Sequence, residues 1–342
     1  MPEKLNIALV GSGAVAPHHI NAWKQISDAQ VRVVFSKPEE KCREFAQKFG
    51  LECAQDFDAI LNNPEIDILD VVVPSGAHAE LGIAGAKAGK HIIVEKPIDV
   101  TLEKADALIN ACRDAKVTLG VVSQYRFMEP VQKLYQYIRD GKMGVLIEGD
   151  AYIKWFRSQE YYASGAWRGT YELDGGGPFI NQGIHFIDML LSVMGPVKSV
   201  YAKTKNVAHP EIEVEDIGVA MVEFVSGAFG VIQASTAIYP GLPARLEIHG
   251  TKGTICIEGE KLAFLHVQGE EPFKAENVEA AGAADPMSID VSPFVREFED
   301  IVSAIREKRE PIVNGAEARR SLQLILAIYE SSKTGNKITL AG

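Results

Sequence analysis

The sequence predicts an α/β protein of two domains, the first a doubly wound parallel sheet over residues 1–122 and the second a strand-rich domain over residues 123–342. Near the N-terminus a glycine-rich turn separates an apolar run from a helical stretch. Apolar runs and helical stretches then alternate to about residue 122, as in a parallel sheet with crossover helices. Beyond residue 150 short segments alternate apolar and polar residues, which is typical of strands with one covered face. A chain of 342 residues also exceeds what one core usually serves.

The elements of the first domain follow from runs of β-branched residues and from helical periodicity. In chain order they are the strand KLNIALV, the helix PHHINAWKQI, the strand VRVVF, the helix PEEKCREFAQKFG, the strand DILDVVVP, the helix HAELGIAGAKAG, the strand HIIVEKP, the helix LEKADALINACRDA and the strand VTLGVV.

The turn GSGAVA after the first strand is the pattern of a dinucleotide site. We expect Gly11 where the chain turns sharply, Gly13 where the backbone approaches a pyrophosphate, and the small Ala16 where the helix packs on the strand. The amides of Ala14 and Val15, at the helix N-terminus, would then face the phosphates. The alternative is that this tight turn serves packing alone.

The ends of the later strands predict further cofactor contacts, because ligands of such sheets lie beyond the carboxyl ends of the strands. After VRVVF stand Ser36 and Lys37 rather than the carboxylate that usually holds the ribose of NAD. A hydroxyl and a cation suit a 2′-phosphate, so we expect NADP(H) in preference to NAD(H). The alternative is that Lys37 is a solvated loop charge.

Five more residues lie at such strand ends: Pro74, Ser75, His78, Glu95 and Lys96. A partly buried lysine loses some of its proton affinity and becomes useful in proton transfer, so Lys96 is a candidate catalytic group. The other reading is a solvated strand terminus.

The segment NQGIHFIDMLLS, residues 181–192, is expected to form a largely buried helix with one polar stripe. At about 100° per residue, Asn181, His185, Asp188 and Ser192 fall within roughly 60° of one another. We interpret this stripe as a wall of the active site in which His185 is catalytic and Asn181 and Asp188 contact substrate. The alternative is that His185 and Asp188 satisfy each other inside a core.

A stretch upstream of this helix mixes aromatic and basic side chains, which is notable in an acidic protein. Aromatic rings stack on sugar C–H surfaces and arginines bind carboxylate or phosphate groups. The candidate substrate-binding residues are Arg126, Arg157, Tyr161, Trp167 and Arg168. An exposed loop with a core tryptophan is the alternative. Downstream, the expected elements are the strands AYIKWF, SVYAKT, IGVAMVEF, AFGVIQAST, ARLEIHG, GTICIEG and KLAFLHV, the acidic, solvated loop 269–286 and two late helices, SPFVREFEDIVSAIREK and AEARRSLQLILAIYESS.

Composition excludes several classes of protein. A net charge of −11 opposes binding to nucleic acid or anionic lipid. The apolar part of MPEKLNIALVG is too short for a secretory signal and no run is long enough to span a membrane. The 4 cysteines are scattered, without a C-x-x-C pair, so we expect no zinc site, no disulfide framework and a reducing cytoplasm.

Taken together, GSGAVAPHH, VVVPSGAH, EKP at 95–97, YRF at 125–127 and the helix with His185 and Asp188 resemble the Gfo/Idh/MocA family of sugar and cyclitol oxidoreductases. The resemblance covers essentially the whole chain. It implies a Rossmann domain followed by an α/β domain with a large, mostly antiparallel open sheet that commonly makes oligomer contacts, so a homodimer or homotetramer is expected. It also implies that Lys96 and His185 face the reacting hydroxyl.

A narrower likeness lies in residues 158–197 and in IEVEDIG at 212–218. Both stretches are similar to UDP-N-acetyl-2-amino-2-deoxyglucuronate 3-dehydrogenases of the WlbA type and to glucoside 3-dehydrogenases. Two positions depart from this pattern. Many relatives carry an aspartate where this chain has Asn181, and the UDP-sugar enzymes use NAD whereas Ser36 and Lys37 suit NADP.

The chemistry expected is hydride transfer between a nicotinamide and a secondary hydroxyl or ketone, at position 3 by the resemblance, of a sugar, sugar nucleotide or cyclitol. His185 would take or return the hydroxyl proton while Lys96 stabilises charge on the same oxygen. No metal is expected. Two alternatives stay open: a dinucleotide-sensing regulator of the same fold that catalyses nothing, and a reductase similar to the biliverdin and dihydrodiol reductases.

Overall fold

A computed structural model describes residues 4–275 and 290–340 of the chain. It divides into two compact units, Met1–Gln124 with Asp290–Arg319 and Tyr125–Ile289 with Arg320–Gly342. The predicted fold class is confirmed, since the first unit holds a parallel sheet and the second a mostly antiparallel one.

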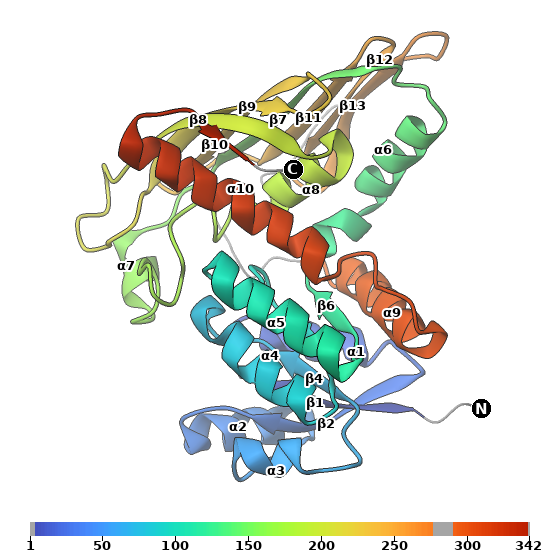
Figure 1. Ribbon diagram of the computed structural model, residues 1–342, viewed down its shortest axis with the longest axis vertical. Coiled ribbons are helices and arrows are strands. Elements are labelled where there is room, and N and C mark those ends of the chain that lie inside the picture. Colours follow the sequence, from blue (N-terminus) through green and yellow to red (C-terminus); the bar gives the residue numbers. More distant parts are fainter. Residues whose placement is uncertain (1–3, 276–289, 341–342) are drawn as a thin grey trace. The chain divides into compact units, whose positions relative to one another are not determined.

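The first unit is built on a six-stranded sheet with the order β3-β2-β1-β4-β5-β6 among its described residues. Every pair is parallel. The strand order reverses between β1 and β4, the position at which such sheets bind ligands. Figure 1 shows α4 and α5 side by side along this sheet. The elements are β1 (Leu5–Val10), α1 (Ala16–Trp23), β2 (Ala29–Phe35), α2 (Glu39–Phe49), β3 (Glu52–Cys53), α3 (Phe57–Leu61), β4 (Ile68–Val71), a 3₁₀ turn (Ser75–Ala77), α4 (His78–Lys87), β5 (His91–Val94), α5 (Leu102–Ala115), β6 (Leu119–Val121) and α9 (Ser292–Glu307).

Helix α9 differs from the expectation of a single boundary at residues 122/123, because it belongs to the first unit. Its rings explain the placement. Phe298 stacks on Trp23 of α1 with 4.3 Å between ring centres, and Phe294 is fully buried beside the same helix. An amphipathic helix reveals its apolar face in the sequence but not the domain on which that face packs.

The second unit contains a nine-stranded sheet, again counted over the described residues, with the order β14-β13-β12-β11-β7-β10-β9-β8-β15. Only β7 and β10 pair in parallel among these strands. Figure 1 shows α8 and α10 on one side of the sheet. The elements are a 3₁₀ turn (Gln124–Phe127), α6 (Glu129–Arg139), β7 (Leu146–Lys154), α7 (Gln159–Ala163), α8 (Ile184–Met194), β8 (Val197–Lys205), β9 (Ile217–Phe224), β10 (Phe229–Ser235), β11 (Arg245–Gly250), β12 (Gly253–Glu258), β13 (Lys261–Val267), β14 (Phe273–Lys274), α10 (Gly315–Thr334) and β15 (Ile338–Thr339).

Burial alternates along the central strands of this second sheet. On β9 the side chains of Ala220, Val222 and Phe224 are buried, while Val219 and Met221, which point to the opposite face, are exposed. One face of the sheet is therefore covered by protein and the other is open.

Cys42 and Cys53 are bonded, a single disulfide that the expectation of no disulfide framework did not anticipate. Cys42 lies on α2 and Cys53 on β3, and the short connection between these elements brings their Cα atoms to 6.0 Å. The scattered spacing in the sequence concealed this pair, since proximity arises from the crossover and not from a motif. The cysteines consequently give no support to the expected reducing compartment.

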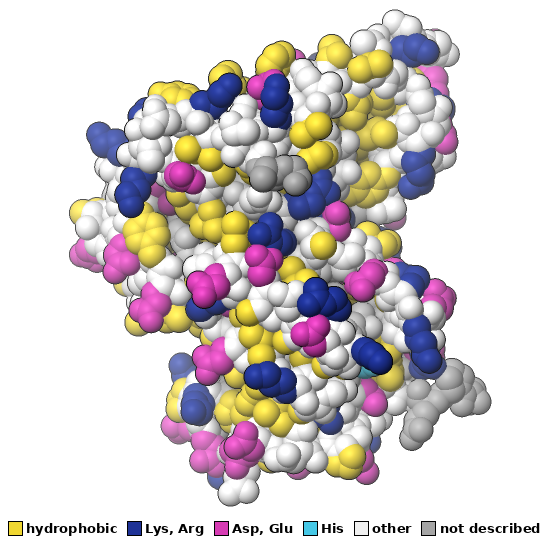
Figure 2. All heavy atoms as spheres, in the orientation of Figure 1, with side chains coloured by type: hydrophobic (Ala, Val, Ile, Leu, Met, Phe, Trp, Pro, Cys, Tyr) yellow, Lys and Arg dark blue, Asp and Glu magenta, His cyan; other side chains and the backbone are white. Residues whose placement is uncertain are grey.

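Three further observations concern the surface. None of the helices in the described residues is both long and apolar enough to cross a membrane. On the face shown in Figure 2, basic and acidic side chains are interspersed, without a large area of one sign. Of the loop expected at 269–286, residues 273 and 274 form the short strand β14, and residues 276–289 lie outside the described part of the chain.

Candidate active site

The glycine turn connects β1 to α1 as predicted. Gly11 has a φ of +116° and its N–H donates to Phe35 O at 2.8 Å, and a Cβ at this position would lie 2.5 Å from Val72 O. Gly11 is therefore required by the turn itself. A Cβ at Gly13 would instead meet no protein atom within 4 Å.

The chain's own packing thus gives no reason for glycine at position 13. Gly13 and Ala14 are exposed, directly before the first turn of α1. An open backbone at a helix N-terminus fits the pyrophosphate of a dinucleotide.

The end of β2 carries the two residues on which the NADP expectation rests. Ser12 Oγ donates to Ser36 Oγ at 2.8 Å, so Ser36 is tied to the glycine turn. Lys37 is exposed. Both residues lie at the carboxyl edge of the parallel sheet, where a nucleotide ribose is expected.

His78 connects the segments that follow β4 and β5. Its Nδ1 lies 2.8 Å from Pro97 O and its Nε2 lies 2.9 Å from Val73 O. Burial lowers the pKa of this imidazole, while the two carbonyls act in the opposite direction. Pro74 and Ser75 precede it at the start of the 3₁₀ turn. His78 therefore holds the backbone after β4 and after β5, and its expected contact with the cofactor stays a prediction.

Glu95 and Lys96 follow β5, and their environments differ. The Glu95 carboxylate is buried: Oε1 lies 3.1 Å from His19 Nε2, and Oε2 accepts the backbone N–H of Lys96 at 3.0 Å. Lys96 is half-buried. Glu95 is thus occupied by protein groups, a role that the expected cofactor contact did not include.

In the second unit, α8 begins at Ile184 and not at Asn181 as predicted. Asn181 lies in the preceding turn, where its N–H donates to Gly177 O at 3.0 Å, so the expected continuous stripe is wrong in its first member. Its side-chain amide donates to Asp174 Oδ1 at 2.5 Å. Asp174 therefore places a carboxylate directly beside Asn181.

His185 lies in the first turn of α8 and is half-buried. Its ring stacks on Tyr125, with 4.6 Å between ring centres and 23° between planes. Tyr125 comes directly after the end of the first unit. Sequence reasoning missed this tyrosine, which fixes the plane of the imidazole.

Asp188 and Arg126, both candidate substrate ligands, bind each other. Arg126 Nε and Nη2 donate to the two Asp188 carboxylate oxygens at 2.6 and 2.7 Å, and Ser321 Oγ donates to Asp188 Oδ1 at 3.0 Å. Both charged side chains are buried. A bidentate pair of this kind is held by geometry as well as charge. It braces α8 behind His185, and a contact with substrate stays a prediction.

The basic and aromatic residues upstream of α8 form a cluster as expected, which we call the arginine–aromatic cluster. Arg168 lies 4.4 Å from the ring centres of both Tyr161 and Trp167, and its Nη1 donates to Tyr161 OH at 2.7 Å. Arg157 lies 5.2 Å from the Trp155 ring and 5.5 Å from the Tyr161 ring. Arg157 is buried and its Nη1 donates to Phe156 O at 2.8 Å, whereas Arg168 is half-buried. Of the two guanidinium groups, that of Arg168 is therefore the more accessible to an anion.

A buried pair not anticipated from the sequence supports this cluster. His209 Nδ1 lies 2.9 Å from Asp216 Oδ2, and its Nε2 lies 2.8 Å from Arg157 O. Asp216 also accepts the backbone N–H groups of Val207, Ala208 and His209. Asp216 belongs to the segment IEVEDIG, which contributed to the family resemblance but was given no role in the sequence analysis.

The three glycines before α8 pack against protein. A Cβ at Gly177 would overlap the backbone oxygen of Glu215, and the Glu215 carboxylate accepts N–H groups from Gly177 and Phe179 at 3.0 and 3.3 Å. Burial raises the pKa of Glu215 to about 7, although Tyr329 OH and these amides oppose the shift. Gly177 is therefore required for close backbone approach to Glu215.

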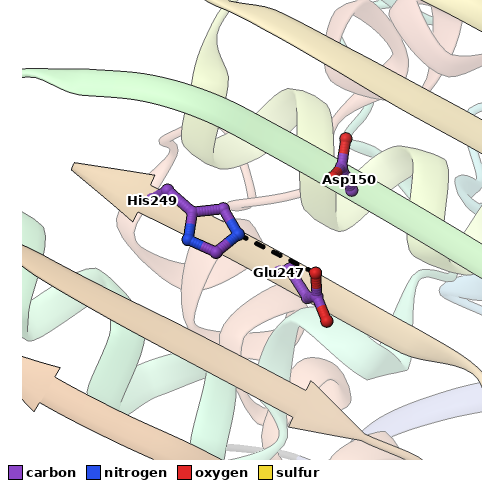
Figure 3. A group of neighbouring side chains, drawn as sticks. All are labelled: Asp150, Glu247 and His249. Atoms are coloured by element: carbon purple, nitrogen blue, oxygen red, sulfur yellow. Dashed lines mark ion pairs between the residues drawn. The ribbon is translucent and has the colours of Figure 1, made fainter.

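One more group of titratable side chains lies in the second sheet: Asp150, Glu247 and His249 (Figure 3). Asp150 and Glu247 are directly opposite each other on β7 and β11. Arg245 Nε lies 2.8 Å from Glu247 Oε1, and Asp150 Oδ1 accepts Val231 N–H at 2.7 Å. Protein donors thus already neutralise or occupy both carboxylates, and we describe the group as an ionic cluster.

Comparison with known proteins matches two family models. A model of an oxidoreductase family with an NAD-binding Rossmann fold matches residues 5–123. A GFO/IDH/MocA C-terminal domain model matches residues 131–256. The first covers the glycine turn and the EKP segment, and the second covers α8 and the arginine–aromatic cluster.

Individual relatives share the whole fold. The WlbA dehydrogenase of Bordetella pertussis, solved in complex with NADH and UDP-GlcNAcA, is 31% identical with a TM-score of 0.87, over 99% of this chain and 100% of that one. Levoglucosan dehydrogenase in complex with NADH and L-sorbose is 25% identical with a TM-score of 0.88, over 99% of both chains. The myo-inositol 2-dehydrogenase of Thermotoga maritima is 26% identical over 98% of both chains. Both solved relatives carry NADH, so the NADP preference expected from Ser36 and Lys37 has no support from them.

Proposed function

Because the chain belongs to the Gfo/Idh/MocA family of NAD-binding oxidoreductases, we propose that it transfers a hydride between a nicotinamide cofactor and a secondary hydroxyl or ketone of an anionic sugar derivative. Sugar nucleotides and sugar acids are the preferred class, with neutral sugars and cyclitols as the alternatives. By resemblance to WlbA-type and glucoside 3-dehydrogenases, the carbon oxidised is at position 3.

We assign the proton transfer to His185. The nicotinamide, when bound, supplies or accepts the hydride. Oxidation of an alcohol also releases the hydroxyl proton, so a general base must lie within hydrogen-bond reach of that oxygen. His185 is the half-exposed histidine of an otherwise buried helix turn, held by the Tyr125 ring, and its position suits repeated gain and loss of a proton.

Lys96 is the second catalytic group of the proposal. As an ammonium it would donate a hydrogen bond to the same oxygen and stabilise the negative charge that develops there. The fixed backbone around it, with its N–H on Glu95 and Pro97 O at His78, supports this role because a small displacement of a catalytic group costs much of its effect.

The arginine–aromatic cluster is the observation that carries the anionic substrate class. Arg157 and Arg168 stack on Trp155, Tyr161 and Trp167 within the same unit as His185. Guanidinium groups bind carboxylates and phosphates through paired hydrogen bonds, and the rings suit sugar C–H surfaces. The UDP-GlcNAcA in the WlbA complex is a ligand of this chemical kind.

The test is a nicotinamide absorbance screen with purified protein over UDP-sugar acids, free sugar acids, glucosides and inositols, each with NAD⁺ and NADP⁺. We expect turnover with an anionic sugar derivative. Turnover restricted to neutral inositols would contradict the substrate class. Dinucleotide binding without turnover of any substrate would instead support the regulator alternative, against which the presence of both Lys96 and His185 speaks.

We also propose that the chain forms a homodimer or homotetramer through the open face of the second sheet. Met221, Phe229 and Val219 are 57%, 60% and 45% exposed on adjacent strands of that face. An apolar surface of this kind is costly in water and favours association. Sedimentation of the wild type and of Met221→Glu should show dissociation of the variant, and a wild type that sediments as a monomer would refute the assignment.

A further inference from the structure

His19 of α1 has a carboxylate at each of its two ring nitrogens. Nδ1 lies 3.0 Å from Asp70 Oδ2 and Nε2 lies 3.1 Å from Glu95 Oε1. His19 and Asp70 are fully buried, and Glu95 is 7% exposed. The three side chains come from α1, from β4 and from the end of β5, so they lie beneath the carboxyl edge of the parallel sheet. We call them the His19 network.

This arrangement dictates the charge of His19. A neutral imidazole has one N–H and one lone pair, so one carboxylate would face a lone pair without a proton between them. An imidazolium donates to both, and an uncompensated buried carboxylate is expensive. The pKa of His19 agrees: burial by itself lowers it, but the charges and hydrogen bonds of Asp70 and Glu95 outweigh burial and raise it to about 10.

Aromatic rings pack against the network, and two further histidines lie near it: His18 beside His19, and His78 near Glu95. Trp23 Nε1 donates to Asp70 Oδ2 at 2.8 Å, and the rings of Phe294 and Phe298 lie 5.5 and 5.1 Å from the His19 ring. The neighbouring His18 has a lowered pKa because of burial and of the His19 charge. These contacts leave the imidazolium little freedom to rotate away from either carboxylate.

The network reaches Lys96 through Glu95. One Glu95 oxygen faces His19 and the other accepts the Lys96 backbone N–H at 3.0 Å. Rotation of the Glu95 carboxyl would break both contacts together. The network is therefore connected to the Lys96 backbone through the Glu95 carboxyl group.

We propose that His19 is a positioning residue for Lys96: its imidazole ring, held between Asp70 and Glu95, fixes the carboxylate that holds the Lys96 backbone and thereby sets the placement and charge environment of the lysine. This inference rests on the proposed role of Lys96 in catalysis. His19 itself touches neither cofactor nor substrate in this assignment.

The protonation state is tested on the unaltered protein. ¹⁵N NMR of histidine-labelled protein at about pH 8 should show both His19 ring nitrogens carrying protons, whereas an ordinary histidine is neutral there. Asp70→Asn, which keeps the shape of the side chain, should remove that signal and so identify it. A neutral His19 in the wild type overturns the proposal, whatever the variants do.

The effect on Lys96 is measured without any substrate. Brief acetylation with acetic anhydride and peptide mass spectrometry give the reactivity of Lys96 relative to the exposed Lys48 of the same unit. In His19→Gln this ratio should change by at least about threefold, because the neighbouring charge and the lysine's placement both change. The matched control is His91→Gln, a half-buried histidine at the opposite end of β5, which should leave the ratio unchanged. An unchanged ratio in a folded His19→Gln variant overturns the proposal.

Kinetics separate positioning from general stability. With the substrate found in the absorbance screen, His19→Gln should lower kcat about tenfold and leave the KM for the dinucleotide within about twofold. Glu95→Gln keeps an acceptor for the Lys96 N–H and should lower kcat less. If His19 acts through Glu95, the double variant should be no slower than His19→Gln alone. Additive losses would show that His19 does not act through Glu95.

Failure of the inference is distinguishable from failure of the proposed function. If Lys96→Met keeps wild-type turnover while the acetylation ratio responds to His19→Gln, the catalytic assignment of Lys96 is wrong and the positioning contact stands. If Lys96→Met abolishes turnover while the acetylation ratio is the same in His19→Gln as in the wild type, the proposed function stands and the inference is wrong.

Discussion

The two units use histidine in opposite ways. His19 in the first unit is fully buried with a carboxylate at each ring nitrogen, whereas His185 in the second is half-buried and lies flat on the Tyr125 ring. A histidine between two buried carboxylates keeps its proton and acts as a fixed charge. His185, against an aromatic ring and half-buried, is the histidine to which the proposal assigns proton transfer. The neighbours, and not the residue type, therefore decide which histidine is available for catalysis.

The largest expected effect sharpens this contrast at His185. His185→Ala should lower kcat by about a hundredfold or more, because a positioned general base contributes about 10²–10⁴-fold. Dinucleotide affinity, measured by fluorescence titration with NADH, should be kept, since the glycine turn lies in the other unit. Arg126→Lys serves as a control for the packing of α8. Wild-type turnover in His185→Ala would show that His185 is not the general base. The contrast between a catalytic and a fixed histidine would then fail.

The next effect concerns stability and tests the fixed charge. Asp70→Ala leaves the His19 imidazolium and the Trp23 N–H without their acceptor, so we expect the free energy of unfolding to fall by about 3–5 kcal/mol. Urea unfolding at neutral pH measures it. The exposed helix-capping Asp56→Ala, which removes the acceptor for Ala59 N–H, is the matched control and should cost about 1 kcal/mol. An equal loss of unfolding free energy in the two variants would contradict a buried His19 charge that Asp70 neutralises.

The same network predicts a pH dependence. The pKa of His19 is raised from 6.5 to about 10, so the folded protein binds this proton more tightly than the unfolded chain does. Its stabilisation is complete below about pH 6.5 and is lost as pH rises through about 10. Urea unfolding across this range should show a decline that His19→Gln largely removes. A wild type with the same alkaline profile as His19→Gln would show that the imidazole is not protonated in the fold.

These contrasts also mark how far the sequence could be interpreted. The glycine turn, the strand ends and the parallel sheet were predicted because each depends on residues close together in the chain. The His19 network was not, since His19 lies 51 positions from Asp70 and 76 from Glu95, and nothing local to any of the three indicates the others. The sequence PHH placed His18 and His19 in one helix, but only the packing shows that His19 is the fully buried one.

In the second unit, too, the predictions succeeded where they depended on residues close together in the chain. The residues of the arginine–aromatic cluster lie within fourteen positions of one another and were identified together. Asn181 was assigned to a helix because the apolar periodicity continues through it, whereas Gly183 N–H donates to Pro178 O and ends that regularity. Arg126 and Asp188, 62 positions apart, were both expected at substrate, and their pairing with each other was not predicted. Helix α6, a strongly amphipathic segment, was overlooked.

A fourth prediction compares the two arginines of the cluster, which differ in burial. Arg168 is half-buried and Arg157 is buried with its backbone held by His209. Arg168→Met keeps the apolar stem and removes the charge, so KM for an anionic sugar derivative should rise about 10-fold to 100-fold with little change in kcat. KM for a neutral glucoside or inositol is the internal control and should hardly move. A parallel rise for both substrates would show that Arg168 supports folding of the loop and not anion binding.

The smallest effect is expected at Lys37, the cation on which the NADP expectation rested. It is exposed, and an exposed charge is screened by salt and contributes little unless geometry fixes it. Lys37→Ala should therefore change the ratio of NADPH to NADH affinity by less than about threefold at physiological ionic strength, measured by fluorescence titration. Ser36→Ala is the companion variant, because Ser36 is held by Ser12 and lies at the same strand end. A tenfold loss of NADPH affinity specific to Lys37→Ala would mean that the 2′-phosphate fixes the lysine on binding. An exposed side chain would then select the cofactor, in contrast to the buried His19 network of the same unit.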